Sequence, residues 1–382
     1  MINSPNFKTF KNYLLSKPTL RDLCLLTLFL IFVIWNPYYL HQQINLFELG
    51  LYLPGIGAVL DGQIPYRDFF HLRGPFELYV PAIMMRVFGE QVEVLSTYFY
   101  VGNVLCLLIC ILIAYRIFPQ RWIFYSFVPV LIARTYPRVV YTYWGGFRYV
   151  WGLLAVYCLV EFILRKRKSW IFAAGVLTAI AGLTSIEVGV CAGADILSSI
   201  LLNQNRFNNV AVYLSGLAVI AIPYFMYLSI NSAWDDYVHS QWLVATQMTQ
   251  TFLQTEPVPS NFWEVCAGLF NPANKNFRQM TPVYAYIFFA VYWWRQRRLK
   301  QIVSTDHAIS GIAVYGFMLY VTGFRNLWAS VFEMSLQPEK IVLFYLLFKV
   351  SQESVFGLNK KACRILMIAV LLSSVGYSFD RF

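Results

Sequence analysis

Residues 95–116 read LSTYFYVGNVLCLLICILIAYR, an apolar run whose one charged residue, Arg116, stands at its end. About 20 mostly apolar residues in a helix are enough to cross the hydrocarbon core of a bilayer, so a membrane-spanning helix is predicted here. The rest of the chain has the same character, because 58% of its 382 residues are hydrophobic and 13% are charged. Soluble proteins carry about 25% charged residues. The composition therefore excludes a soluble enzyme, a coiled coil, a disordered chain and a small disulfide scaffold.

The same length criterion predicts an all-α polytopic membrane protein with about eleven transmembrane helices, in which residues 1–382 form a single integral-membrane domain. A long first outer loop (39–94) and a second long outer loop (231–280) are expected between spans. The predicted spans are 22–38, 95–116, 122–136, 149–164, 169–184, 187–203, 209–230, 281–295, 307–323, 338–350 and 363–377.

Basic residues predict the orientation of these spans. Most of the 30 Lys and Arg residues fall in loops at one end of the predicted helices, notably 165–168 and 295–300. Such loops are typical of the cytoplasmic side. The polar and basic residues 1–21 would then be a cytoplasmic N-terminal segment before a signal anchor, in a multi-pass protein of the plasma or inner membrane. Most of the net charge of +11 is thus an orientation signal, and nucleic acid is not an expected partner.

Metal and cofactor motifs are not evident in the sequence. Six of the seven cysteines lie in or beside apolar spans, the four His residues are scattered, and there is no phosphate-binding loop or dinucleotide fingerprint. No cofactor is therefore certain. A divalent cation could bind the adjacent carboxylates of Asp235 and Asp236, because hard cations prefer oxygen ligands. The alternative is that this pair starts a helix or is simply solvated.

The first outer loop is predicted to contain two short helices. Apolar residues recur over 49–59, and Asp61-Gly62 follows as a turn signal. A second apolar stretch, 78–88, is too short to span a bilayer and is followed by Gly89, so it should lie in the membrane interface.

Between these two helices, acidic, basic and aromatic side chains crowd into eight residues. Anchoring at a bilayer does not require such a mixture, so a functional site is one interpretation. The other is an interfacial turn held by an Arg–Asp pair. The residues are Tyr66, Arg67, Asp68, His71 and Arg73.

The stretch DGQIPYRDFF (61–70), followed by Gly74-Pro75-Phe76 and closed by Phe88-Gly89, resembles the first outer loop of GT-C glycosyltransferases. Within that superfamily it is most similar to the bacterial membrane proteins related to protein mannosyltransferases and aminoarabinose transferases. The resemblance implies transfer of a sugar, of hexosyltransferase type, from a polyprenyl-phosphate carrier to a lipid or glycan acceptor of the cell envelope. It places the active site on the outer, periplasmic face, among membrane lipids.

The resemblance also implies which carboxylates act. The family has an acidic pair about a dozen residues before the loop's turn; here Glu48 occupies the first position and Leu49 the second. An inverting transfer needs a carboxylate that takes the proton of the acceptor hydroxyl. Glu48 is therefore the expected base, and Asp68 a second acid that orients the acceptor or replaces Glu48. Because one acid is missing, a catalytically impaired GT-C-like scaffold is an open alternative.

Cationic and imidazole side chains would hold the phosphate as negative charge develops on it. Some have a structural alternative: those of the aromatic segment 134–149 could anchor it at the interface, and the one after residue 323 could snorkel. The candidates for binding substrate or phosphate are Arg67, His71, Arg73, Arg138, Arg148 and Arg325.

A transporter or flippase for lipid-linked saccharides is the alternative from another class. It would line a mid-membrane passage with charged residues, but within the predicted spans Glu161, Glu187 and Asp195 stand nearly alone. The distribution favours an enzyme. For Glu187, pairing with an outer-loop Arg is the structural alternative to a functional role.

Overall fold

The computed structural model is all-helical over the part of the chain that it describes, with an isolated bridge between Pro65 and Phe69 and no strand there. The described residues are 5–34, 46–135, 147–202, 205–247, 277–323 and 337–352, with the single positions 365 and 368.

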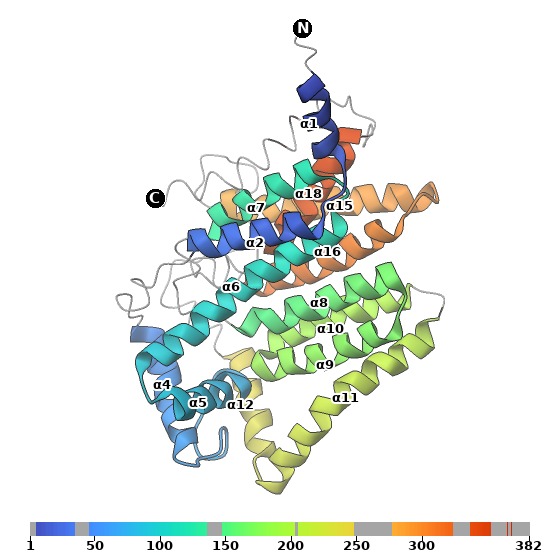
Figure 1. Cartoon of the computed structure of the whole chain (residues 1–382). Helices are drawn as coiled ribbons and strands as arrows, with labels where there is room; N and C mark the ends of the chain where they lie inside the picture. Colours follow the sequence, from blue (N-terminus) through green and yellow to red (C-terminus); the bar gives the residue numbers. More distant parts are fainter. Residues whose placement is uncertain are drawn as a thin grey trace.

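The helices of these segments are labelled in Figure 1. They are α1 (Pro5–Leu15), α2 (Leu20–Ile34), α4 (Leu46–Leu60), α5 (Phe76–Phe88), α6 (Val92–Ile117), α7 (Arg121–Thr135), α8 (Phe147–Arg165), α9 (Lys168–Thr184), α10 (Ile186–Leu201), α11 (Arg206–Ile230), α12 (Trp234–Thr246), α15 (Phe277–Arg298), α16 (Ser304–Gly323) and α18 (Gln337–Gln352).

Every predicted span up to residue 350 coincides with a helix, so the all-α class is confirmed. The last predicted span, 363–377, lies outside the described residues apart from two positions. In the described part of the chain, α6, α8 and α11 are long and apolar enough to cross a bilayer. Shorter apolar helical stretches are found in parts of α4 and α7 and over the whole of α9. The figure of eleven crossings stays a prediction.

The bundle has a central group of helices and a smaller group at one end. Helices α8, α9 and α10 pack side by side, with α6, α11 and α16 around them. Figure 1 shows α4, α5 and α12 gathered near one end of this bundle, close to the start of α6. The two groups have separate apolar cores, and α6 contributes to both.

Helices α9 and α11 approach each other through two glycines. A Cβ on Gly175 would lie 2.2 Å from the carbonyl oxygen of Tyr213, and one on Gly216 would lie 2.2 Å from that of Phe172. Small residues at such contacts are typical of helices packed in membranes, because they let backbones come together.

The two helices expected in the first outer loop are present as α4 and α5. They pack against each other at Gly55, where a Cβ would meet Leu78 at 3.0 Å. Helix α5 ends at Gly89, whose φ of 102° suits glycine and whose N–H donates to the carbonyl of Met85 at 2.8 Å. Gly62, with φ of 85°, makes the turn after α4.

Replacing Gly175 with Ala should destabilise the α9–α11 contact, by about 1–3 kcal/mol as for other overpacked interiors. The midpoint of thermal unfolding in detergent measures this. Gly182→Ala is the matched control on α9, because a Cβ there meets nothing within 4 Å. Equal midpoints for the two variants would contradict the close backbone contact.

Candidate active site

The loop between α4 and α5 is docked on the C-terminal end of α9. The N–H of Gly74 donates to the carbonyl of Thr184 at 3.0 Å. A Cβ on Gly74 would lie 2.0 Å from the carbonyl oxygen of Leu183, so no other residue fits without displacing backbone. This contact places the start of α5 beside the junction of α9 and α10.

The loop is also held by Tyr66, which is buried. Its backbone has a left-handed φ of 74°, and its N–H donates to the carbonyl of Phe69 at 2.9 Å. The phenolic hydroxyl donates to the carbonyl of Arg73 at 2.5 Å, while the ring packs edge-on against Tyr237 of α12 at 5.0 Å between centroids. A left-handed tyrosine is strained, so these contacts impose the conformation.

Arg67 and Asp68 form an exposed ion pair, which is the structural alternative foreseen for this turn. Arg67 Nε and Nη2 donate to the two carboxylate oxygens of Asp68 at 2.8 and 3.0 Å, and the N–H of Ile64 donates to Oδ2 at 2.7 Å. Arg67 also reaches the carbonyl of Asn231 at 3.2 Å. The bond from Arg67 lowers the pKa of Asp68, so this carboxylate is a weak base.

Glu77, in the first turn of α5, is a buried carboxylate with 1% of its surface exposed. The hydroxyl of Tyr52 on α4 donates to its Oε2 at 2.5 Å. Burial raises the pKa of Glu77, against the opposing effects of Arg73, of the Tyr52 hydrogen bond and of Arg148. A carboxylate with a raised pKa is a better proton acceptor, and several charged groups meet here.

Arg73 is half-buried, and its charge acts on both Glu77 and His71. Its guanidinium makes no ion pair or hydrogen bond with the residues that the structure describes. Arg73 is therefore a cation beside a buried carboxylate whose donors remain available for a ligand.

Arg148, at the start of α8, is buried and paired with Glu187 of α10 through Nη2. Its Nε donates to the hydroxyl of Ser185 at 3.1 Å. The structural alternative for Glu187 is thus confirmed in that it pairs with an arginine, Arg148. Since Arg148 also acts on Glu77, the α8–α10 end of the bundle contributes to the same polar cluster.

His71 is buried against the ring of Tyr52, with ring centroids 6.0 Å apart. Burial and the charge of Arg73 lower its pKa to about 3, so the imidazole is neutral at physiological pH. Its Nε2 is buried without a hydrogen-bond partner among the described residues. A buried nitrogen without a hydrogen bond costs free energy, so this position suits a polar atom of a ligand.

The described candidates therefore fall into two groups, an exposed pair (Arg67, Asp68) and a buried cluster (Tyr52, His71, Arg73, Glu77, Arg148). Glu48 lies on α4 one helical turn before Tyr52, and its side chain is outside the described part, as are Arg138 and Arg325 altogether.

Glu77 is not among the site residues that the sequence predicted. The sequence signal for Glu77 is an acidic residue directly after Gly74-Pro75-Phe76, at the start of an apolar helix. An ionisable side chain in such apolar surroundings often belongs to a functional site.

Asp235 and Asp236 are exposed in the first turn of α12, where carboxylates favour the helix dipole. This is the helix-start arrangement. Among the described residues no three His, Cys, Asp or Glu side chains gather as ligands for a metal. Binding of a divalent cation by Asp235 and Asp236 stays a prediction.

Comparison of the sequence with protein-family models gives no match, and comparison with curated proteins gives none either. Two solved structures are similar in fold. One is ArnT from Cupriavidus metallidurans bound to undecaprenyl phosphate, with a TM-score of 0.50 and 13% identity, over 94% of this chain and 74% of that one.

The second is the archaeal oligosaccharyltransferase AglB from Archaeoglobus fulgidus, in complex with an inhibitory peptide and a dolichol-phosphate. Its TM-score is 0.50 and its identity 12%, over 94% of this chain. The chain spans 54% of AglB, about half its length. Both proteins are GT-C superfamily members, so the expected resemblance to GT-C is confirmed at the level of the fold.

The raised pKa of Glu77 predicts a pH-dependent stability. The folded protein binds this proton more tightly than the unfolded chain, so stability is lost as the pH rises above the ordinary value of 4.5, with a slope of at most about 1.4 kcal/mol per pH unit. Glu77→Gln, which stays neutral, should flatten this dependence. Thermal unfolding from pH 4 to 8 compares the two, with the exposed Glu90→Gln as control. A constant difference between wild type and Glu77→Gln across that range would contradict the raised pKa.

Proposed function

We propose that this protein is a membrane glycosyltransferase that moves a sugar from a polyprenyl-phosphate carrier to a cell-envelope acceptor on the periplasmic face. The observation that carries the proposal is the buried Glu77 carboxylate beside Arg73, whose guanidinium pairs with no described residue, in a loop docked on a GT-C-type fold. Lipid phosphates bound to the two similar proteins support a ligand of this class.

The distribution of charge supports the periplasmic side. Helix α8 begins at the polar cluster with Arg148 and ends at the basic segment 165–168, about 27 Å away at 1.5 Å per residue. The connections after α10 and α15 are also basic, with Arg206 and 297–300. Figure 1 shows these connections at the end of the bundle away from α4 and α5. With basic loops in the cytoplasm, the polar cluster faces outward.

The reaction needs one proton acceptor and no general acid. A carboxylate takes the proton of the acceptor hydroxyl while that oxygen bonds to the anomeric carbon. The bond from the anomeric carbon to the phosphate oxygen breaks, and its electron pair leaves with the polyprenyl phosphate. The leaving group departs as an anion, so cations that stabilise it accelerate the step.

Glu48 is the proposed base, one helical turn before Tyr52 on α4. Glu77, hydrogen-bonded to Tyr52, is proposed as the second carboxylate, in place of the acid that is missing at position 49. Asp68 is the alternative second carboxylate, but its oxygens are occupied by Arg67 and Ile64, so it would act only after Arg67 moves.

Arg73 and His71 are proposed to bind the donor phosphate. Arg73 offers donors that no described residue uses, and neutral His71 offers its buried Nε2. Arg67 could join them by exchanging Asp68 for phosphate, and Arg148 adds positive charge from α8. Arg138 and Arg325 are proposed as further phosphate ligands from the sequence alone.

Removing the carboxylates should reduce transfer. Glu48→Gln and Glu77→Gln should each lower the rate by about 10²-fold or more, the usual contribution of general base catalysis. The assay follows a labelled sugar from a chemically defined polyprenyl-phosphate hexose into a membrane lipid extract. Unchanged activity in both Glu48→Gln and Asp68→Asn would contradict the base taken from the sequence. Glu77→Gln at the wild-type rate would contradict its role as the second carboxylate.

Arg73→Gln should weaken binding of polyprenyl phosphate by about tenfold or more, because a charge-assisted hydrogen bond contributes about 1.5–3 kcal/mol. Binding of undecaprenyl phosphate to the purified protein measures this directly. Arg86→Gln is the matched control, since it removes an exposed arginine from the far end of α5. Equal losses in both variants would indicate general attraction to charge rather than a site at Arg73.

A further inference from the structure

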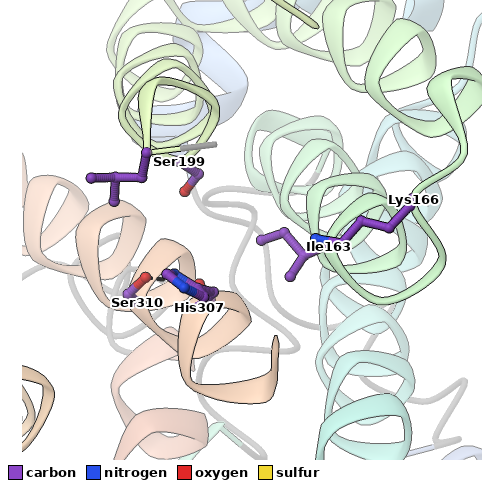
Figure 2. Close-up of a pocket in the computed structure, with 6 residues that line it drawn as sticks. Ile163, Lys166, Ser199, His307 and Ser310 are labelled. Carbon is purple, nitrogen blue, oxygen red and sulfur yellow. Dashed lines mark hydrogen bonds between the residues drawn. The ribbon is translucent and has the colours of Figure 1, made fainter. Parts of the chain in front are cut away.

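A second polar pocket lies at the opposite end of the helix bundle. It is formed where α8 and α10 end and α16 begins, and it is partly open to the surroundings. Figure 2 shows Ser199, His307 and Ser310 facing the same space as the Ile163–Lys166 turn. The lining residues are Ile163, Lys166, Ser199, Leu202, His307 and Ser310.

Two basic side chains line the pocket. Neither the Lys166 ammonium nor the His307 imidazole makes an ion pair or hydrogen bond with the described residues. The charges of Lys166, Arg297 and Asp306 all act on His307, so two cations and one carboxylate lie near this imidazole. His307 also lies in the first turns of α16, where backbone N–H groups carry partial positive charge.

Hydroxyl groups and apolar surface complete the lining. Ser199 donates to Asp195, one turn deeper on α10, at 3.4 Å, and Gly311 lets α16 approach that carboxylate. The hydroxyl of Ser310 donates to the carbonyl of His307 at 2.8 Å. Leu202 is half exposed, and with Ile163 it gives the pocket an apolar side.

We propose that this pocket binds a phosphate group, carried by an anionic phospholipid or free in solution. An ammonium and an imidazole that no described residue pairs, beside hydroxyls, suit phosphate oxygens. Basic pockets between helices at the cytoplasmic surface suit lipid headgroups. The exposed Leu202 offers a surface for the start of an acyl chain. The site lies about 27 Å along α8 from Arg148, so it does not depend on the proposed transfer reaction.

The test measures lipid binding to the purified full-length protein by native mass spectrometry. The probes are dioleoyl phosphatidic acid, dioleoyl phosphatidylcholine and inorganic phosphate. Lys166→Gln should weaken binding of phosphatidic acid by about fivefold, which corresponds to about 1 kcal/mol for one cation near the membrane surface. His307→Gln should also weaken binding, because it removes the imidazole from the pocket lining. Lys168→Gln is the matched control, because it removes the same charge two residues away, outside the pocket lining.

Two arms distinguish the source of the phosphate. If inorganic phosphate displaces phosphatidic acid from the wild type, the pocket also takes the free anion; if it does not, the lipid headgroup is the ligand. Equal losses in Lys166→Gln and Lys168→Gln, or none in Lys166→Gln and His307→Gln, would overturn the proposal. The proposal would also be overturned if these two substitutions weakened binding of phosphatidylcholine as much as binding of phosphatidic acid. His307→Gln lies on a different helix, so the test stands even if Lys166→Gln misfolds.

Discussion

The hydrogen bond between Gly74 and Thr184 holds the loop between α4 and α5 against the helix bundle, and the polar cluster depends on it. The carbonyl of Leu183 lies where any side chain at position 74 would begin. Through this contact Glu77 on α5 comes within the influence of Arg148 on α8, although the two are far apart in the sequence. Without the docking, α4 and α5 would still pack on each other, but the cluster would lose Arg148 of α8.

Burial and nearby positive charge have opposite effects on the acids of this loop. Burying a carboxylate costs free energy unless it is paired or hydrogen-bonded. Burial raises the pKa of Glu77, although the hydrogen bond from Tyr52 and the charges of Arg73 and Arg148 act to lower it. Asp68 shows the reverse, because its ion pair with Arg67 is exposed and keeps the carboxylate charged. Asp68 lies in the loop and Glu77 in the first turn of the helix that follows it, and their surroundings give the two acids different chemistry.

The two ends of the bundle differ in charge and in the polar groups that they present. One end joins carboxylates to arginines around the loop between α4 and α5, and the other has basic connections with a pocket between α8, α10 and α16. A carboxylate beside cations suits proton transfer and phosphate departure, whereas cations with hydroxyls suit binding alone. The separation follows from helix length, since α8 has one end in each region.

The sequence by itself determined the local features of this protein. Apolar runs predicted the helices, and Gly62 and Gly89 marked the turn after α4 and the end of α5, because hydropathy and backbone conformation depend on neighbouring residues. Only the tertiary structure decided that Glu187 pairs with Arg148 and that Glu77 is buried. These outcomes depend on contacts between segments far apart in the chain, and neither periodicity nor motif spacing encodes which charged groups will share a buried space.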